Sequence, residues 1–137
     1  SQLLSRVVED SVSGELGLSS RQWRVLVMLN RLGPSTSGQV AAATRLDHSQ
    51  VSRASYELAD KGLIAMESDA ADRRKQTLGV APAGVELLRR GIVGSLDRQA
   101  RLQGCLNEEE YAVLGRALTK LTAQAQAMLA EGRDNRN

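Results

Sequence analysis

The chain has 137 residues, of which 42% are hydrophobic and 25% charged, and its net charge is +2. This composition is that of a globular protein, so we expect a single domain over residues 1–137, with no cofactor. The single Cys105 and the single His48 exclude a disulfide framework and most clustered metal or catalytic sites, and no apolar run could span a bilayer, so we expect a cytoplasmic protein.

The first two predicted elements are amphipathic helices. Apolar residues at three- and four-residue spacing predict a helix over residues 3–16, which Gly17 can end. A second helix begins after Ser19, because Gln22 follows three residues later as in a capping box, and it ends before residues 33–34, Gly-Pro. We expect Trp23 in this helix to be a core or interface residue rather than a ligand-stacking one.

Two shorter capped helices follow, joined by a tight turn. Thr36 with Gln39 starts the first, which is built mainly from small residues, and Asp47 with Gln50 starts the second, within residues 46–61. This is a helix-turn-helix pattern. Thr36, Ser37 and the backbone N–H groups of the first short helix could hold a phosphate.

The second short helix has two different faces. Its apolar face, which we expect to be buried, consists of Val51, Ala54, Ser55 and Leu58, and its other face carries Ser49, Gln50, Arg53 and Tyr56. Such a polar face suits the base edges of a DNA major groove, but taken alone it also describes a solvated amphipathic helix. The residues that follow the helix help to decide between a DNA-reading helix and a solvated one.

A hairpin follows the helix-turn-helix. Gly62 is expected to end the helix, and residues 63–68 and 76–80 alternate as two strands around the polar turn 69–75. The sequence therefore predicts a two-stranded wing over residues 64–80 and a winged-helix core over residues 19–81. The fold class is mainly α with a small β-wing.

The remainder of the chain is predicted to be helical. Pro82 suits the first position of a long helix that Gly91 and Gly94 could bend, and residues 104–106 form a break. Asn107 then caps a last helix with a heptad-like apolar seam, formed by Tyr111, Leu114, Leu118, Leu121, Ala125 and Met128.

These features together resemble the MarR family of winged-helix transcription factors. The resemblance is carried by LSSRQWRVLVML, by SGQVAAATRLDHSQVSRASYELADKGLI and by DAADRRKQTLGVAPAG, within about residues 18–91. It implies a homodimer that binds double-stranded DNA at a pseudo-palindromic operator, acts as a repressor and is released by a small molecule or an oxidant. The helices in residues 1–17 and 83–131 would form the dimer, through Leu4, Val8, Tyr111, Leu114, Leu118 and Leu121.

The resemblance also assigns individual residues to DNA. It places Ser49, Gln50, Ser52 and Arg53 at the recognition surface and Asp72 and Arg74 in the wing, where Arg73 and Lys75 would add phosphate contacts. The phosphate-binding candidates Thr36 and Ser37, and His48 at the helix start, complete the predicted DNA-binding residues. In the family's wing pair the carboxylate, here Asp72, orients the guanidinium, here Arg74, which enters the minor groove. A narrow minor groove concentrates negative potential, which attracts arginine. For His48, a place in the capping region or at the edge of the core is the alternative to a groove or phosphate contact.

Two features depart from the family. Ala81 stands where threonine usually caps the next helix, so this helix start is expected to be less well held. The only thiol, Cys105, lies far from the N-terminal helix that carries the reactive cysteine of oxidant-sensing members, and we expect it to be buried or at an interface rather than a sensor.

Two other functions compete with DNA binding as interpretations of the sequence. Residues 45–75 carry six basic and six acidic side chains, and this balance favours the alternative of a winged-helix module that binds another protein. An enzyme is not expected, because the chain lacks a metal-ligand cluster, a glycine-rich phosphate loop and a nucleophile elbow.

Overall fold

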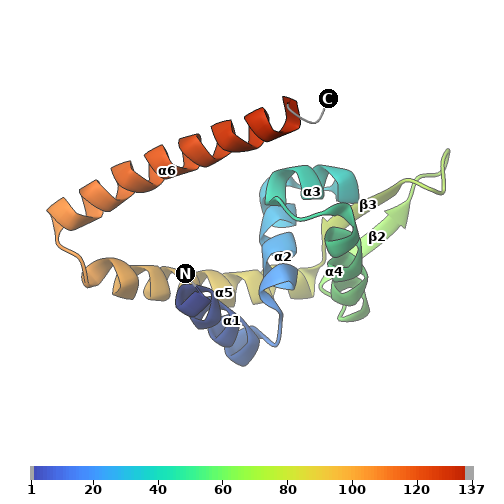
Figure 1. The fold of residues 1–137 in the computed structure, drawn as a ribbon. Helices are drawn as coiled ribbons and strands as arrows, with labels where there is room; N and C mark the ends of the chain where they lie inside the picture. The colour runs from blue at the N-terminus through green and yellow to red at the C-terminus, as the bar shows by residue number, and fades with distance from the viewer. Residues whose placement is uncertain (1, 135–137) are drawn as a thin grey trace. The chain divides into compact units, whose positions relative to one another are not determined.

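The computed structural model describes residues 2–134, so the ends of the predicted range 1–137 lie outside the described residues. The chain divides into two compact units, Ser1–Ser95 and Leu96–Asn137, and each is described by itself. The elements in chain order are α1 (Gln2–Leu16), α2 (Ser20–Leu32), β1 (Ser35–Thr36), α3 (Ser37–Thr44), α4 (His48–Asp60), β2 (Ile64–Ser68), β3 (Gln76–Val80), α5 (Pro82–Gly104) and α6 (Glu108–Asp134) (Figure 1). The fold is mainly α with a small sheet, as predicted.

The helix starts follow the predicted capping boxes. At Ser19, Thr36, Asp47 and Asn107 the side chain accepts the backbone N–H three residues later, and the residue at that position bonds back. Each box satisfies N–H groups that have no partner within the helix, and each uses only residues three positions apart. Four helix starts are therefore confirmed.

The sheet has three strands rather than the two predicted. β2 and β3 form the expected hairpin, with Ile64 opposite Val80 and Met66 opposite Leu78. β1 pairs antiparallel with the other edge of β3, so the strand order is β1-β3-β2. Two residues beside a helix cap are too short to produce an alternation in sequence, which is why β1 was missed. Its pairing fixes the start of α3 beside the wing.

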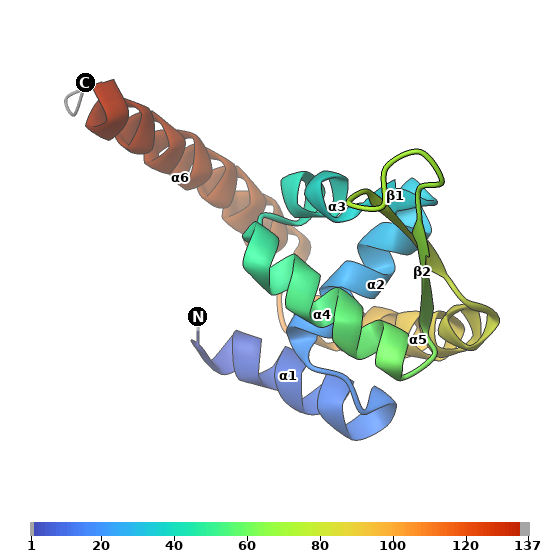
Figure 2. The ribbon, with the colours of Figure 1, turned by 90° about the vertical axis from the view of Figure 1, so that its right-hand side faces the viewer.

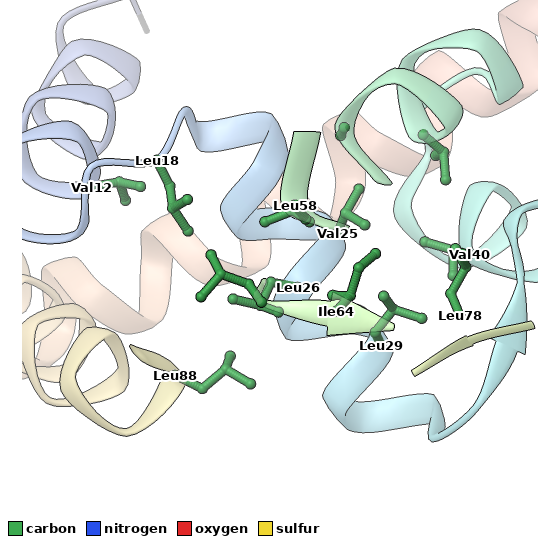
Figure 3. Packing of buried hydrophobic residues seen from close by; sticks show 13 residues of the cluster. Val12, Leu18, Val25, Leu26, Leu29, Val40, Leu58, Ile64, Leu78 and Leu88 are labelled. Atoms are coloured by element: carbon green, nitrogen blue, oxygen red, sulfur yellow. The ribbon is translucent and has the colours of Figure 1, made fainter. Parts of the chain in front are cut away.

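The core of the first unit lies where α2, α4 and the sheet meet (Figure 3). It contains no aromatic ring among its buried residues, in keeping with the composition. Trp23 packs against this core and is half-buried, which confirms its predicted core role. The buried apolar residues are Val12, Leu18, Val25, Leu26, Leu29, Val40, Val51, Ala54, Leu58, Leu63, Ile64, Leu78 and Leu88.

Glycines in α5 allow close contacts with neighbouring elements. A side chain at Gly91 would overlap the Trp23 ring, and one at Gly94 would overlap the Glu15 carboxylate. α5 is helical throughout Pro82–Gly104, across both positions. These two glycines therefore allow close packing against α1 and α2, and the expected bend stays a prediction.

Gly84 makes the tightest approach and gives a direct test of the packing. A Cβ there would overlap the carbonyl oxygen of Leu63, which also accepts the N–H of Ala81 and so holds the start of α5. We expect Gly84→Ala to lower the free energy of unfolding by about 1–3 kcal/mol, because backbone must move to relieve the overlap. Urea unfolding measures the change.

The matched control for this substitution is Gly14→Ala. Gly14 is also a helical glycine, but its Cβ would meet nothing within 4 Å. Alanine should raise stability there by about 0.5–1 kcal/mol, through helix propensity. Equal effects of the two substitutions would contradict the packing at Gly84.

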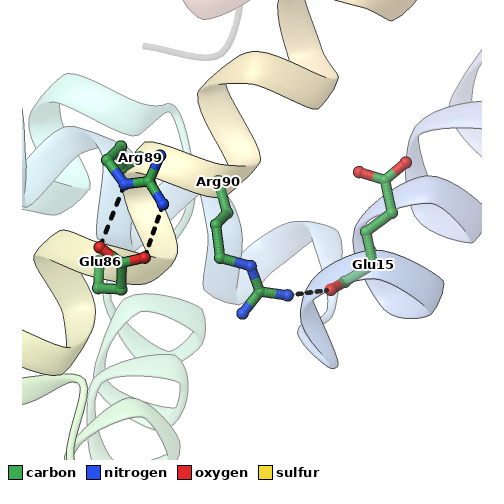
Figure 4. Close-up of polar contacts among 4 residues, drawn as sticks. All are labelled: Glu15, Glu86, Arg89 and Arg90. Atoms are coloured by element: carbon green, nitrogen blue, oxygen red, sulfur yellow. Dashed lines mark hydrogen bonds and ion pairs between the residues drawn. The ribbon is translucent and has the colours of Figure 1, made fainter.

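Polar contacts connect α5 with α1 (Figure 4). Arg90 donates from its guanidinium to the backbone carbonyl of Glu15 at 3.3 Å. On the exposed side of α5, Arg89 donates two hydrogen bonds to Glu86, of 3.1 and 2.8 Å. These bonds, together with the charge of Arg89, lower the pKa of the Glu86 carboxyl below its ordinary value. The exposed pair contributes little to stability, whereas the Arg90 contact joins two elements of the unit.

The second unit contains the end of α5 and all of α6. Gln103 donates to the Tyr111 hydroxyl across the turn between the two helices, at 3.1 Å. Cys105 in this turn is exposed, which excludes burial within the chain and leaves its expected place at an interface as a prediction; its thiol donates to the carbonyl oxygen of Leu102. Within the described part of α6, Tyr111, Leu114, Leu118 and Leu121 all have exposed side chains, as does Leu4 in the first unit.

Neither a membrane-spanning helix nor a metal-binding cluster is present among residues 2–134. The described helices are too short or too polar to cross a bilayer. The described His, Cys, Asp and Glu side chains form no group of three that could hold a metal ion.

Candidate nucleic-acid interface

Helix α4 buries the face that its sequence predicts. Val51, Ala54, Ser55 and Leu58 are all buried. The Ser55 hydroxyl donates to the Val51 carbonyl at 2.7 Å, so the one polar group on this face is satisfied inside the core. The opposite face is therefore turned outward, with Ser49, Arg53 and Tyr56 exposed and Gln50 half-buried.

A Schellman motif ends α4. Gly62 has a left-handed backbone with φ of 72°, and its N–H bonds the Ala59 carbonyl, while the N–H of Leu63 bonds the Leu58 carbonyl. This is the pairing expected when glycine follows the C-cap residue, here Lys61. The chain then enters β2 directly, which brings the wing beside the C-terminal part of α4 (Figure 2).

A buried amide positions α4 against α2. Gln22 accepts the Ser19 N–H through Oε1 and donates from Nε2 to the Glu57 carboxylate at 2.6 Å. The residue is only 8% exposed, so this bond to α4 also satisfies its second polar group. Sequence reasoning found the cap but missed the link, because the partner is 35 residues away.

Aspartates shape the tip of the wing. Asp69 accepts the N–H of Ala71 at 2.7 Å, and Asp72 accepts the backbone N–H of Arg74 at 3.0 Å. These are Asx-type turns, in which a side chain replaces a backbone partner. The resemblance implied that Asp72 orients the guanidinium itself; in this structure its carboxylate instead holds the backbone from which that side chain projects. The contribution of Asp69 was not anticipated.

A groove of about 510 Å³ lies between the start of α3, one side of α4 and the wing. Six of the residues proposed from sequence line it together, although they come from three elements: Thr36, Ser37, His48, Ser52, Arg74 and Lys75. Gly38, Tyr56 and Gln76 complete the lining. Ser49, Gln50, Arg53, Asp72 and Arg73 are outside it. His48 is exposed at the first position of α4, directly after the Asp47 cap, so a core-edge position is wrong, whereas a capping-region position agrees with the structure.

Gly38 and Gln76 were not anticipated as parts of this surface. Gln76 begins β3 and pairs with Ser68, so its place in the strand was predictable but its proximity to α3 was not. That proximity depends on β1, which brings Ser35 and Thr36 to β3.

The groove is electropositive although residues 45–75 are neutral as a whole. Among the described residues its lining contains two cationic side chains, Arg74 and Lys75, and no carboxylate. The start of α3 adds the partial positive charge of a helix N-terminus. Several acidic groups of the segment make hydrogen bonds elsewhere, as Asp47 does in its cap and Glu57 does to Gln22. The local charge therefore favours an anionic partner.

Comparison with known proteins gives a family and a set of similar folds. Residues 16–75 match the profile of the MarR family. No curated protein matches the chain.

Among solved structures, the chain is similar to the Bordetella bronchiseptica protein BpsR, described in terms of regulation of its DNA binding by 6-hydroxynicotinic acid. The two share 26% identity with a TM-score of 0.71, over 88% of this chain and 96% of that one.

Two Streptomyces coelicolor regulators have the same fold. Sco3205, a MarR family transcriptional regulator solved in complex with DNA, gives a TM-score of 0.79 at 22% identity, over 90% of this chain and 79% of that one. PcaV, a transcriptional regulator solved with its natural ligand, gives a TM-score of 0.76 at 21% identity, over 90% of this chain and 89% of that one.

Proposed function

Because the winged-helix core of this chain belongs to the MarR family of transcriptional regulators, we propose that the protein is a sequence-specific repressor that binds an operator as a homodimer. The single observation that supports this most is the electropositive groove, which collects side chains from α3, α4 and the wing. In this proposal α4 enters the major groove of DNA, and the wing tip contacts the adjacent minor groove.

The proposed contacts divide into two kinds. Thr36, Ser37 and Lys75 would bind phosphates, as would His48 and Arg73, and these contacts set orientation without reading sequence. Ser49, Gln50, Ser52 and Arg53 would face base edges from α4, with Arg74 in the minor groove beside the Asp72 turn. A helix that exposes hydrogen-bonding groups and buries its aliphatic ones is suited to this division.

A homodimer is proposed because apolar side chains of α6 lack burial within the chain. Leu114, Leu118 and Leu121 are 46%, 53% and 66% exposed, at the spacing of a coiled-coil seam. Together with Leu4, Val8 and Tyr111 they would be covered by a second copy. The two copies of α4 should then lie about 34–36 Å apart, to reach successive major grooves of a pseudo-palindromic operator.

We also propose that a small molecule releases the DNA. The support is by likeness: the similar BpsR is described as regulated by 6-hydroxynicotinic acid, and the similar PcaV was solved with its natural ligand. Such an effector would lower the DNA affinity of the dimer.

Selection of bound fragments from a random DNA pool tests the proposed function. The expected result is a pseudo-palindrome with half-sites about one helical turn apart. A pool from which no sequence is enriched, combined with protein binding that salt does not weaken, would favour the alternative module that binds another protein.

The salt dependence of the affinity for the selected fragment measures how many phosphates the protein contacts. About three to five phosphate contacts per protomer give a slope of roughly −5 to −9 for log K against log salt concentration. A titration of affinity over a range of salt concentrations measures it. A slope near zero would contradict an interface built on phosphate contacts.

A further inference from the structure

We propose that Gln50 acts as a hydrogen-bond donor toward its base, and so selects a base edge that offers an acceptor. This inference rests on the proposed function, because it concerns the same surface of α4. It goes further by stating what chemistry one position of the half-site must have. The reason lies in the capping box at the start of the helix.

The capping box fixes the two ends of the Gln50 amide. Oε1 accepts the backbone N–H of Asp47 at 3.2 Å, while the backbone N–H of Gln50 donates to Asp47 Oδ1 at 2.7 Å. The amide oxygen is thus turned back toward the protein's own backbone. The NH₂ group, on the other side of the same planar amide, is the part directed away from that contact.

The orientation of the amide matters for base recognition because of where Gln50 lies in the helix. It is the third residue of α4, and in a helix-turn-helix the N-terminal residues of the recognition helix approach the base edges. In the major groove, guanine presents N7 and O6, adenine N7 and thymine O4 as acceptors, whereas cytosine presents the donor N4–H₂. A capped Gln50 therefore disfavours cytosine on the contacted strand.

The cap also removes an alternative geometry. A free glutamine can bind adenine through both its oxygen and its nitrogen, but that bidentate contact needs Oε1. Breaking the box to release Oε1 would leave the N–H of Asp47 without its partner. Arg53 lies three residues further along the same side of the helix and is also donor-only, so the two side chains together favour acceptor-rich edges such as guanine.

Gln50→Glu separates the two roles of the side chain. Glutamate is an ordinary partner in a capping box, so its first oxygen can still accept the Asp47 N–H. Its second oxygen is an acceptor where glutamine had a donor. We expect the selected half-site to change at one position, from an acceptor-bearing base to cytosine, by about three- to tenfold in preference per half-site, with thermal stability almost unchanged.

The selection is run with the parent protein, with Gln50→Glu and with Gln50→Ala. Alanine should lower the melting temperature through loss of the cap and should relax the preference at the same single position. The bases read by Arg53 and the half-site spacing serve as internal controls, and they should stay as in the parent.

The outcomes are separable. Identical base profiles for the parent and Gln50→Ala would overturn the inference, even if Gln50→Glu bound no DNA because of its charge. A preference of the parent for cytosine at that position would also overturn it, because cytosine presents a donor there. If the parent itself enriches no sequence, the proposed function fails, whereas a clear operator with an unchanged profile leaves that function standing and removes only the role of Gln50.

Discussion

Arg74→Ala is expected to weaken operator binding by the dimer about 30- to 1000-fold. The estimate takes a loss of about 1–2 kcal/mol for each of two wings. The guanidinium would leave the minor groove, where negative potential is concentrated, and the Asp72 carboxylate holds the backbone from which the Arg74 side chain projects. The slope of log K against log salt should also become less negative, by about two for the dimer.

The substitution should affect DNA binding without affecting the fold of the wing, because Asp72 bonds the backbone of residue 74 rather than its side chain. Alanine keeps that N–H, so the wing turn should persist and the melting temperature should not fall. Arg89→Ala is the matched control: it removes the same charge from an exposed position of α5, outside the groove. A gel shift that shows equal affinity for Arg74→Ala and the parent would contradict the wing role.

Leu118→Glu is expected to convert the protein to a monomer at micromolar concentration and to abolish operator binding. In the proposed dimer the substitution places two carboxylates, one from each copy, in an apolar seam, and each buried unpaired charge costs several kcal/mol. Within the chain the Leu118 side chain is 53% exposed, so the subunit itself should remain folded. A monomer can present only one recognition helix to DNA.

Ala123→Glu provides the control for charge and helix position. Ala123 is exposed on α6 and lies about 170° around the helix from the centre of the seam, at about 100° per residue. The Ala123→Glu substitution introduces the same carboxylate and should leave both the dimer and DNA binding intact. Light scattering combined with a gel shift measures both properties. A dimeric Leu118→Glu protein that still binds the operator would place the interface elsewhere.

The predictions from sequence succeeded where the determining contacts are local. The boxes at Ser19, Thr36, Asp47 and Asn107 each depend on residues three positions apart. The buried face of α4 follows from helical periodicity, and the register of β2 and β3 follows from strand alternation. Local pattern and local hydrogen bonding therefore determined these elements.

The same reasoning missed contacts that depend on a residue's surroundings. Gly91 and Gly94 indicated flexibility in sequence, but they provide room for Trp23 and Glu15. The Asp72 turn was missed although it is local, because a carboxylate can accept a backbone N–H as well as orient a guanidinium. A glycine or an aspartate has several possible uses, and only its surroundings decide among them.

The candidate interface, too, could be predicted from sequence only in part. Its residue types, the helix-turn-helix and the basic turn can all be found in the sequence. The balanced charge of residues 45–75 cannot be interpreted there, because sequence alone does not show that Asp47 and Glu57 make hydrogen bonds within the protein. Both carboxylates lie outside the groove that Arg74 and Lys75 line, and its lining has no acidic residue among the described residues.

The sequence by itself determined the order of elements, where most helices begin and which face of α4 is buried, because these depend on hydrogen bonds and periodicities spanning a few residues. Tertiary structure alone decided that Thr36 and Ser37 lie beside Arg74 and Lys75. That proximity results from pairing β1 with β3, whose partners, Ser35 with Leu78 and Thr36 with Thr77, are about 40 residues apart in the chain. Contacts at such separation form only when the whole core packs, because each must offset the entropy of closing a long loop.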